Sequence, residues 1–248
     1  MKKLLLPVLL GFWCGLAVEA ADKPAGALPT VDQLLEKQLK AVGGKEAALK
    51  LKSRVIKASL EVPAMGATVT AEFQSKAPNK TLNVIEIPGV GTIREGFDGT
   101  MGWSQNPFTG LSEKSATEVA AIKRQADFYR DIRLRELYPK MTVTGSAKVG
   151  GHDTYVVEAT PAEGGTDKLY FAADSGLVLR MDSTTETPAG KLATEIYFED
   201  HRDVDGVKIP FTIRQPEPSA AAFTVKITEV KHNATLDDAL FLKPAAAK

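Results

Sequence analysis

The sequence predicts a mainly β protein of the α+β class, with about eleven strands and helices covering one concave face. The sheet is expected to be antiparallel, either strongly curved or closed into a half-open barrel. Two observations lead to this prediction. After residue 55 most of the chain alternates apolar and polar residues, which is typical of strands with one buried face. The segments between these runs are too short for the crossovers that parallel strands need.

The N-terminus has the pattern of a secretory signal peptide. Lys2 and Lys3 precede an apolar run from Leu4 to Val18, and Val18-Glu19-Ala20 is a small-x-small cleavage site. Cleavage near Ala20 predicts export to a bacterial periplasm. It would also remove Cys14, the only cysteine, so no disulfide is expected in the mature chain.

The expected organisation is a signal peptide (1–20), a flexible leader (21–29), one domain (30–244) and a short tail (245–248). Lys and Arg total 31 and Asp and Glu total 31, without a basic stripe. A nucleic-acid partner is therefore not expected.

A helical segment opens the domain. Thr30 and Gln33 form a capping-box pattern, apolar residues then recur at helical spacing, and Gly43-Gly44 ends the run. A second short helical stretch is expected over 45–51.

Strands follow. The alternating runs 56–62 and 67–74, joined by a turn at 63–66, predict an antiparallel hairpin. Further strands are expected near 80–87, 91–97 and 100–105. In the second half, alternation over 155–160, 177–182 and 223–228 predicts a meander whose turns include Asp205-Gly206.

One helical insertion interrupts the strands. The segment 115–138 contains no Gly or Pro, and its apolar residues fall at helical spacing. It is interpreted either as a functional lid or as a helix that simply caps the core.

Catalytic and metal-binding patterns are missing from the sequence. No G-x-S-x-G motif is present, and the three histidines (His152, His201 and His232) are not spaced as metal ligands and are expected at the surface. Asp203, Asp205 and Gly206 match only part of a calcium loop. We therefore expect no enzyme activity, no metal and no cofactor.

Aromatic and apolar residues gather in the middle of the chain. If the helices leave a gap over the sheet, these residues would line an apolar ligand cavity; otherwise they are ordinary core. The candidate cavity residues are Phe97, Trp103, Phe108, Phe128, Tyr129 and Leu134.

Several stretches resemble the bacterial outer-membrane lipoprotein-sorting proteins, the LolA-like family. They are Ile93 to Gly110, Ala126-Asp127-Phe128, Tyr197 to Phe211 and Leu236 to Pro244. The resemblance implies a half-open barrel with an apolar concave face, lidded by helices, that binds acyl chains and carries lipoproteins across the periplasm. It also implies an arginine on the barrel that holds the lid, for which Arg94, Arg180 and Arg214 are candidates.

With this resemblance, residues 30–244 are expected to form a lipid-binding domain. The expected function is a monomeric periplasmic carrier or binding protein for a lipid, a lipoprotein acyl chain or another hydrophobic ligand. Membrane-bound donor and acceptor proteins would be its partners. The alternative is a non-catalytic envelope scaffold or interaction module without a small ligand.

Overall fold

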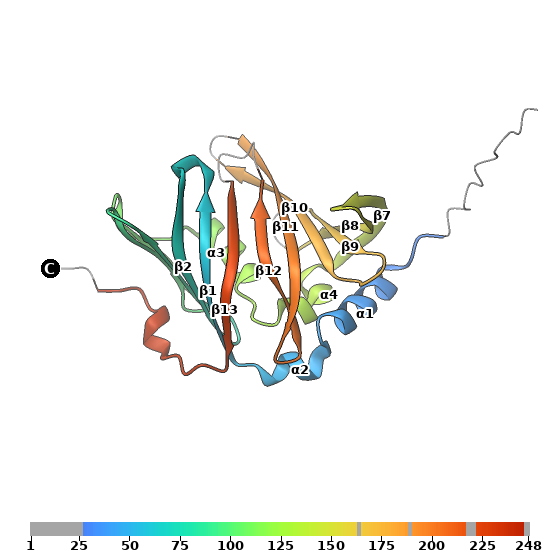
Figure 1. Cartoon of the computed structure of the whole chain (residues 1–248), viewed down its shortest axis with the longest axis horizontal. Helices are drawn as coiled ribbons and strands as arrows, with labels where there is room; N and C mark the ends of the chain where they lie inside the picture. The colour runs from blue at the N-terminus through green and yellow to red at the C-terminus, as the bar shows by residue number, and fades with distance from the viewer. Residues whose placement is uncertain (1–26, 163–164, 188–189, 217–221, 246–248) are drawn as a thin grey trace, which may run out of the picture.

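The computed structural model describes residues 27–245, apart from 163–164, 188–189 and 217–221 (Figure 1). The expected signal peptide, most of the leader and the last three residues of the tail lie outside the described residues. No helix in these described segments is long and apolar enough to cross a membrane.

One mainly antiparallel sheet dominates the fold. In the part of the chain described, it holds 13 strands rather than the eleven or so expected, in the order β6-β5-β4-β3-β2-β1-β13-β12-β11-β10-β9-β8-β7. The first meander comprises β1 (Ser53–Val62), β2 (Ala67–Lys76), β3 (Lys80–Ile87), β4 (Gly91–Phe97), β5 (Gly102–Asn106) and β6 (Gly110–Glu113). The second comprises β7 (Lys140–Val149), β8 (His152–Thr160), β9 (Asp167–Ala172), β10 (Val178–Thr187), β11 (Gly190–Val204), β12 (Val207–Gln215) and β13 (Phe223–His232).

The two meanders meet in the centre, where β1 pairs with β13, while β6 and β7 remain as free edges. The sheet is therefore unclosed, and Figure 1 shows that it is curved. The expected fold class is right at this level. The predicted number of strands was too low partly because β6 has only four residues, too few for an alternating pattern to be recognised in the sequence.

The first helix begins where the sequence predicts. α1 (Val31–Ala41) has the capping box, because the Gln33 amide donates to Thr30 Oγ1 and the Thr30 amide donates to Gln33 Oε1. After Gly43, α2 (Gly44–Lys50) follows. Gly43 has a φ of +104°, and a Cβ there would lie 2.0 Å from the carbonyl oxygen of Gly206, so only glycine lets this turn approach β12.

The expected helical insertion is present, but it is broken into short pieces. It consists of α3 (Ala116–Gln125), a 3₁₀ turn η2 (Arg130–Ile132) and the single-turn α4 (Leu134–Leu137). The break has a clear cause. The Phe128 amide donates to the carbonyl oxygen of Pro78, and the Asp127 carboxylate accepts from the Tyr129 amide at 2.9 Å. These bonds replace the helical ladder after Ala126. We call the segment 115–138 the lid.

The helices lie against one side of the sheet, which we call the inner face. In Figure 1, β2, β1, β13 and β12 stand in front of α3 and α4. Phe128 of the lid packs in the same cluster as Ala58 of β1 and Ile227 of β13. Leu34 of α1 packs with Val157 and Phe171 at the other end of the sheet.

The opposite, outer face of β3–β5 is covered by the C-terminal segment. The turn η3 (Asp238–Phe241) places Phe241, which is fully buried, against Leu82 and Trp103. The Trp103 indole N–H donates to the carbonyl oxygen of Phe241 at 2.9 Å. Because this segment follows β13, it links the second meander to the first.

Gly96 is required by this outer-face packing. It lies opposite Trp103, and a Cβ at this position would be 2.3 Å from the indole ring. We expect Gly96→Ala to lower the free energy of unfolding by about 1–3 kcal/mol through overpacking. Urea denaturation measures this loss. In a Trp103→Leu background the same substitution should cost clearly less, and an equal cost would contradict the assigned clash.

Candidate functional site

An apolar strip crosses the inner face in two rows. Side chains directly opposite each other on paired strands share a face, so the register fixes both rows. The first row is Ile93, Ile85, Ala71, Ala58 and Ile227, on β4, β3, β2, β1 and β13. The second row is Val69, Leu60, Val225, Ile213 and Phe198, on β2, β1, β13, β12 and β11.

The lid covers this strip only in part. Ile93, Ile85, Leu60 and Ile213 are half-buried, although they lie on the concave side of a curved sheet. Ala71 and Ala58, in the middle of the first row, are only 5% exposed. Their short side chains make the surface of the strip lower there than at the isoleucines on either side. Each row spans five strands, or about 19 Å at the usual strand spacing.

A cavity of about 420 Å³ lies between α3 and strands β3–β5. Its volume is within the range of small-molecule sites. Phe97, Ala121, Ile122 and Ala126 form its apolar lining, and Phe97 is only 1% exposed. Its polar lining comes from Thr81, Asn83, Glu95, Lys114, Glu118 and Gln125. We call this space the α3 cavity.

The ions at the α3 cavity form one group. Lys114 Nζ lies 2.9 Å from Glu95 Oε1 and 3.6 Å from Glu118 Oε1. These carboxylates hold the pKa of Lys114 above its usual value, although burial acts against them. Glu118 also caps α3, because the Ser115 amide donates to its Oε2 at 2.8 Å, and this lowers the pKa of Glu118. The group carries a net charge of about −1 at neutral pH.

A second polar group lies beneath the lid on the centre of the sheet. Arg54 of β1 donates through Nε to Nε2 of His232 on β13 at 3.0 Å, and its guanidinium lies over the Phe128 ring, 5.4 Å from the centroid. His232 Nδ1 is 2.9 Å from Asp205 Oδ2, so the neutral ring carries its proton on Nδ1. Beside Arg54 and Phe128 is a small cavity of about 30 Å³, room for one water molecule.

The His232 side chain is 1% exposed, so the expectation that all three histidines lie at the surface was wrong for this one. Burial lowers its pKa below the ordinary 6.5, and the Arg54 charge adds to this against the opposing effect of Asp205. Burial also lowers the pKa of His201. Native His232 is therefore neutral at pH 7.

This lowered pKa predicts a loss of stability in mild acid. Below about pH 6.5 the imidazole of His232 is protonated in the unfolded state but remains neutral in the native state. The free energy of unfolding therefore falls as the pH falls toward the native pKa of His232. Above that range the contribution is fully present. We expect His232→Gln, a neutral side chain that can still accept from Arg54, to flatten this decline between pH 7 and 5 in urea denaturation. His152→Gln, at a side chain 58% exposed, is the matched control. Equal slopes in all three proteins would refute the assignment.

A buried carboxylate attaches the lid to the other end of the sheet. Asp167 of β9 is 3% exposed. Its Oδ2 accepts from the Tyr138 hydroxyl at 2.7 Å, and its Oδ1 accepts from Ser183 Oγ at 2.7 Å. Arg124 of α3 lies 3.7 Å from Oδ2. Burial, followed by the Asp167 charge, raises the pKa of Tyr138 to about 12.

The six predicted cavity residues do not lie together. Phe97 lines the α3 cavity, and Phe128 and Tyr129 line the small cavity beside Arg54. Leu134 packs at the margin of the α1 core. Trp103 borders the α3 cavity, but its indole lies on the outer face against Phe241, and Phe108 is 74% exposed in the β5–β6 turn.

The three arginines proposed as lid anchors lie on the outer face. Arg94 is opposite Val84, out of phase with the apolar strip. Arg180 is opposite Tyr170 and Tyr197, and Arg214 is opposite Tyr197. The arginine beneath the lid is instead Arg54, which pattern reasoning missed.

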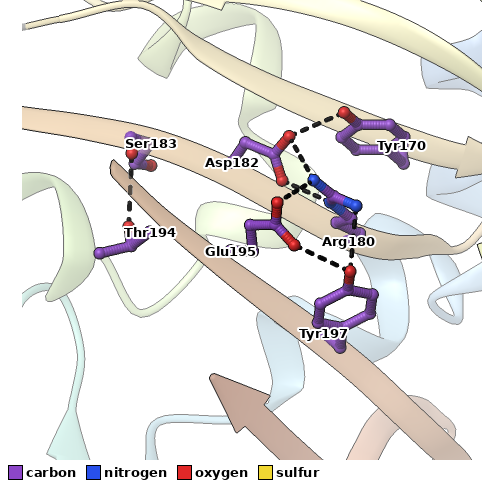
Figure 2. Close-up of polar contacts among 7 residues, drawn as sticks. All are labelled: Tyr170, Arg180, Asp182, Ser183, Thr194, Glu195 and Tyr197. Atoms are coloured by element: carbon purple, nitrogen blue, oxygen red, sulfur yellow. Dashed lines mark hydrogen bonds and ion pairs between the residues drawn. The ribbon is translucent and has the colours of Figure 1, made fainter. Parts of the chain in front are cut away.

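Figure 2 shows the outer-face group around Arg180. Its guanidinium is held by Asp182 and Glu195 and lies between the rings of Tyr170 and Tyr197, at 4.8 and 5.3 Å from their centroids. Burial, together with the bond to Asp182, raises the pKa of Tyr170 to about 12. Every partner of this arginine is on the sheet itself, so the group stabilises the pairing of β9, β10 and β11.

No group of three or more His, Cys, Asp or Glu side chains that could hold a metal ion occurs among the described residues. The Asp205-Gly206 pair forms the two-residue turn between β11 and β12, with φ of +54° and +80°. The hairpin interpretation of this acidic stretch is therefore confirmed.

Comparison with known proteins gives similarity at the level of structure. No protein-family model matches the sequence, and no curated protein matches it. A lipoprotein-sorting domain of Vibrio parahaemolyticus superposes with a TM-score of 0.58 at 10% identity, over 84% of this chain and 94% of that one. A LolA superfamily protein of Nitrosomonas europaea gives 0.57 at 14% identity, over 87% and 99%.

A DUF1329 family protein of Desulfovibrio piger gives a TM-score of 0.56 at 18% identity, over 86% of this chain and 97% of that one. The three matches each cover at least 84% of this chain. At these identities the likeness is one of fold. This chain therefore shares the fold of a LolA superfamily protein, a lipoprotein-sorting domain and a DUF1329 family protein.

Proposed function

We propose that this protein is a periplasmic carrier or binding protein for the acyl chain of a lipid or lipoprotein. The main support for this proposal is the apolar strip. It consists of two rows of apolar side chains, each across five strands, on a concave face that the lid covers only in part. An acyl chain gains about 0.8 kcal/mol for each CH₂ that it buries, so such a surface can bind it without a catalytic group. The shared fold with lipoprotein-sorting proteins supports the same assignment.

The ligand would lie between the strip and the lid. The lid is held at two places, by Phe128 at Pro78 and Arg54 and by Arg124 and Tyr138 at Asp167. Away from these points α3 contacts the sheet mainly at β5. Entry would require α3 to move away from β3–β5 while both attachments persist. The signal-peptide pattern of residues 1–20 supports a periplasmic location for this activity.

The first test is native mass spectrometry of the protein purified from the periplasm without detergent, with lipid extraction in parallel. We expect a bound species whose mass matches an extracted lipid or acylated peptide. A protein that remains ligand-free when lipids are offered would contradict the proposal. That outcome would favour the scaffold alternative, for which the free edges of β6 and β7 are available surfaces. The β7 edge is interrupted by an irregularity between Val143 and Gly145 and carries Lys140 and Lys148, features that limit edge pairing.

A further inference from the structure

The α3 cavity lies next to the apolar strip but differs from it in polarity. Asn83 and Glu95 lie opposite each other on β3 and β4. Ile85 and Ile93, two residues along the same strands, are opposite each other in the first row of the strip. Alternate residues on a strand are about 7 Å apart. An amphiphile whose tail lies on the strip would therefore bring its headgroup to the α3 cavity.

Three neutral side chains in this cavity have unused hydrogen-bonding capacity. Thr81, Asn83 and Gln125 line it, and none of them makes a side-chain hydrogen bond to any other described residue. Each can both donate and accept. Gln125 is exposed and Thr81 and Asn83 are half-buried, so their polar atoms face water in the free protein and remain available to hydroxyl groups of a ligand.

The charges at the cavity select among headgroups. Lys114 already has two carboxylate partners, Glu95 and Glu118, so the rim carries about one net negative charge. A phosphate or sulfate headgroup would be repelled by this negative charge. Lys114, the cation that could bind it, is already paired with Glu95 and Glu118. An ammonium is a donor only and would offer no acceptor to the amide N–H groups of Asn83 and Gln125. Hydroxyl groups donate and accept, as the three free side chains do.

We infer that the α3 cavity is a headgroup site for a neutral, hydroxyl-bearing amphiphile such as a glycolipid. This inference rests on the proposed function and specifies its ligand class. The tail lies on the apolar strip, and the hydroxyl groups pair with Thr81, Asn83 and Gln125. The ligand therefore has a fixed orientation, with its polar end under α3.

Isothermal titration calorimetry with chain-matched probes tests this inference. Octyl glucoside, octylammonium and octyl sulfate are offered below their micellar concentrations, with methyl glucoside as a sugar without a tail. We expect octyl glucoside to bind at least tenfold more tightly than the two charged probes and methyl glucoside to bind undetectably. Methyl glucoside binding as tightly as octyl glucoside would identify a free sugar as the ligand and overturn the orientation argued here.

Variants connect the preference to the cavity. Asn83→Leu and Gln125→Leu should each weaken octyl glucoside binding about tenfold and leave octyl sulfate binding unchanged. Gln125 is at the exposed end of α3, so its substitution tests the site even if Asn83→Leu impairs folding. Gln105→Leu, on the outer face opposite Arg94, is the control. Equal affinity for all three octyl probes, unaffected by these variants, would overturn the headgroup site while leaving the carrier proposal in place. Failure of every octyl probe to bind would overturn both.

Discussion

Replacing Asp167 with alanine is expected to lower the free energy of unfolding by about 3–5 kcal/mol. The substitution leaves the buried Tyr138 hydroxyl and Ser183 Oγ without their acceptor and removes the carboxylate facing Arg124. Urea denaturation followed by circular dichroism measures the effect. Glu158→Ala, at a side chain 47% exposed on neighbouring β8, is the matched control and should change stability by no more than about 0.5 kcal/mol.

The same substitution should also loosen the lid. Tyr138 and Arg124 connect the end of α4 and the end of α3 to β9 through Asp167, so their release frees both helices at one end. Hydrogen exchange in the segment 115–138 should accelerate before global unfolding. A stability loss below about 1 kcal/mol with unchanged exchange would show that Asp167 does not hold the lid.

Ile93→Lys is expected to weaken binding of a fluorescent acyl-chain probe by about 10- to 100-fold, or about 1.4–2.8 kcal/mol. Ile93 ends the first row of the apolar strip and is half-buried, so a lysine there places an ammonium where the acyl chain would lie. Thr92→Lys is the matched control, because Thr92 is the adjacent residue on the other face of β4. Affinity is measured by probe titration, after thermal unfolding shows that both variants fold.

The two lysine variants give a clear contrast. A loss with Ile93→Lys alone places the ligand on the inner face. Equal binding by both variants and the native chain would exclude the first row as the binding surface. Loss with both would indicate a general effect of added charge.

Alternation of apolar and polar residues was sufficient to predict the class of fold and several strands. The ranges 80–87 and 91–97 match β3 and β4, and the capping box fixed the start of α1. Alternation depends only on the local chain, so it could not predict the order of strands. In particular, the pairing of β1 with β13 joins segments about 170 residues apart.

The site was harder to predict because its polar residues are isolated in the sequence. A signal was nevertheless present: Arg54 is in phase with Ile56 and Ala58, and Asp167 is in phase with Leu169 and Phe171. A charged residue on the apolar phase of a strand must face the interior. Phe108 and Trp103 were predicted to line the cavity because they are aromatic. Residue type alone does not show on which face of the sheet a side chain lies. The break in the lid depends on the contact of Phe128 with Pro78, which no local pattern contains.

The β1–β13 pairing also has a consequence for how the chain folds. Each meander consists of hairpins between neighbours in sequence, which close quickly because their loops are short. Joining them requires the ends of the domain to meet, and that step has the largest entropy of loop closure. The apolar strip crosses this junction, with Ala58 on one side and Ile227 on the other. A bound acyl chain would therefore contact both meanders at their junction and would stabilise the one step of assembly that local hairpins cannot supply.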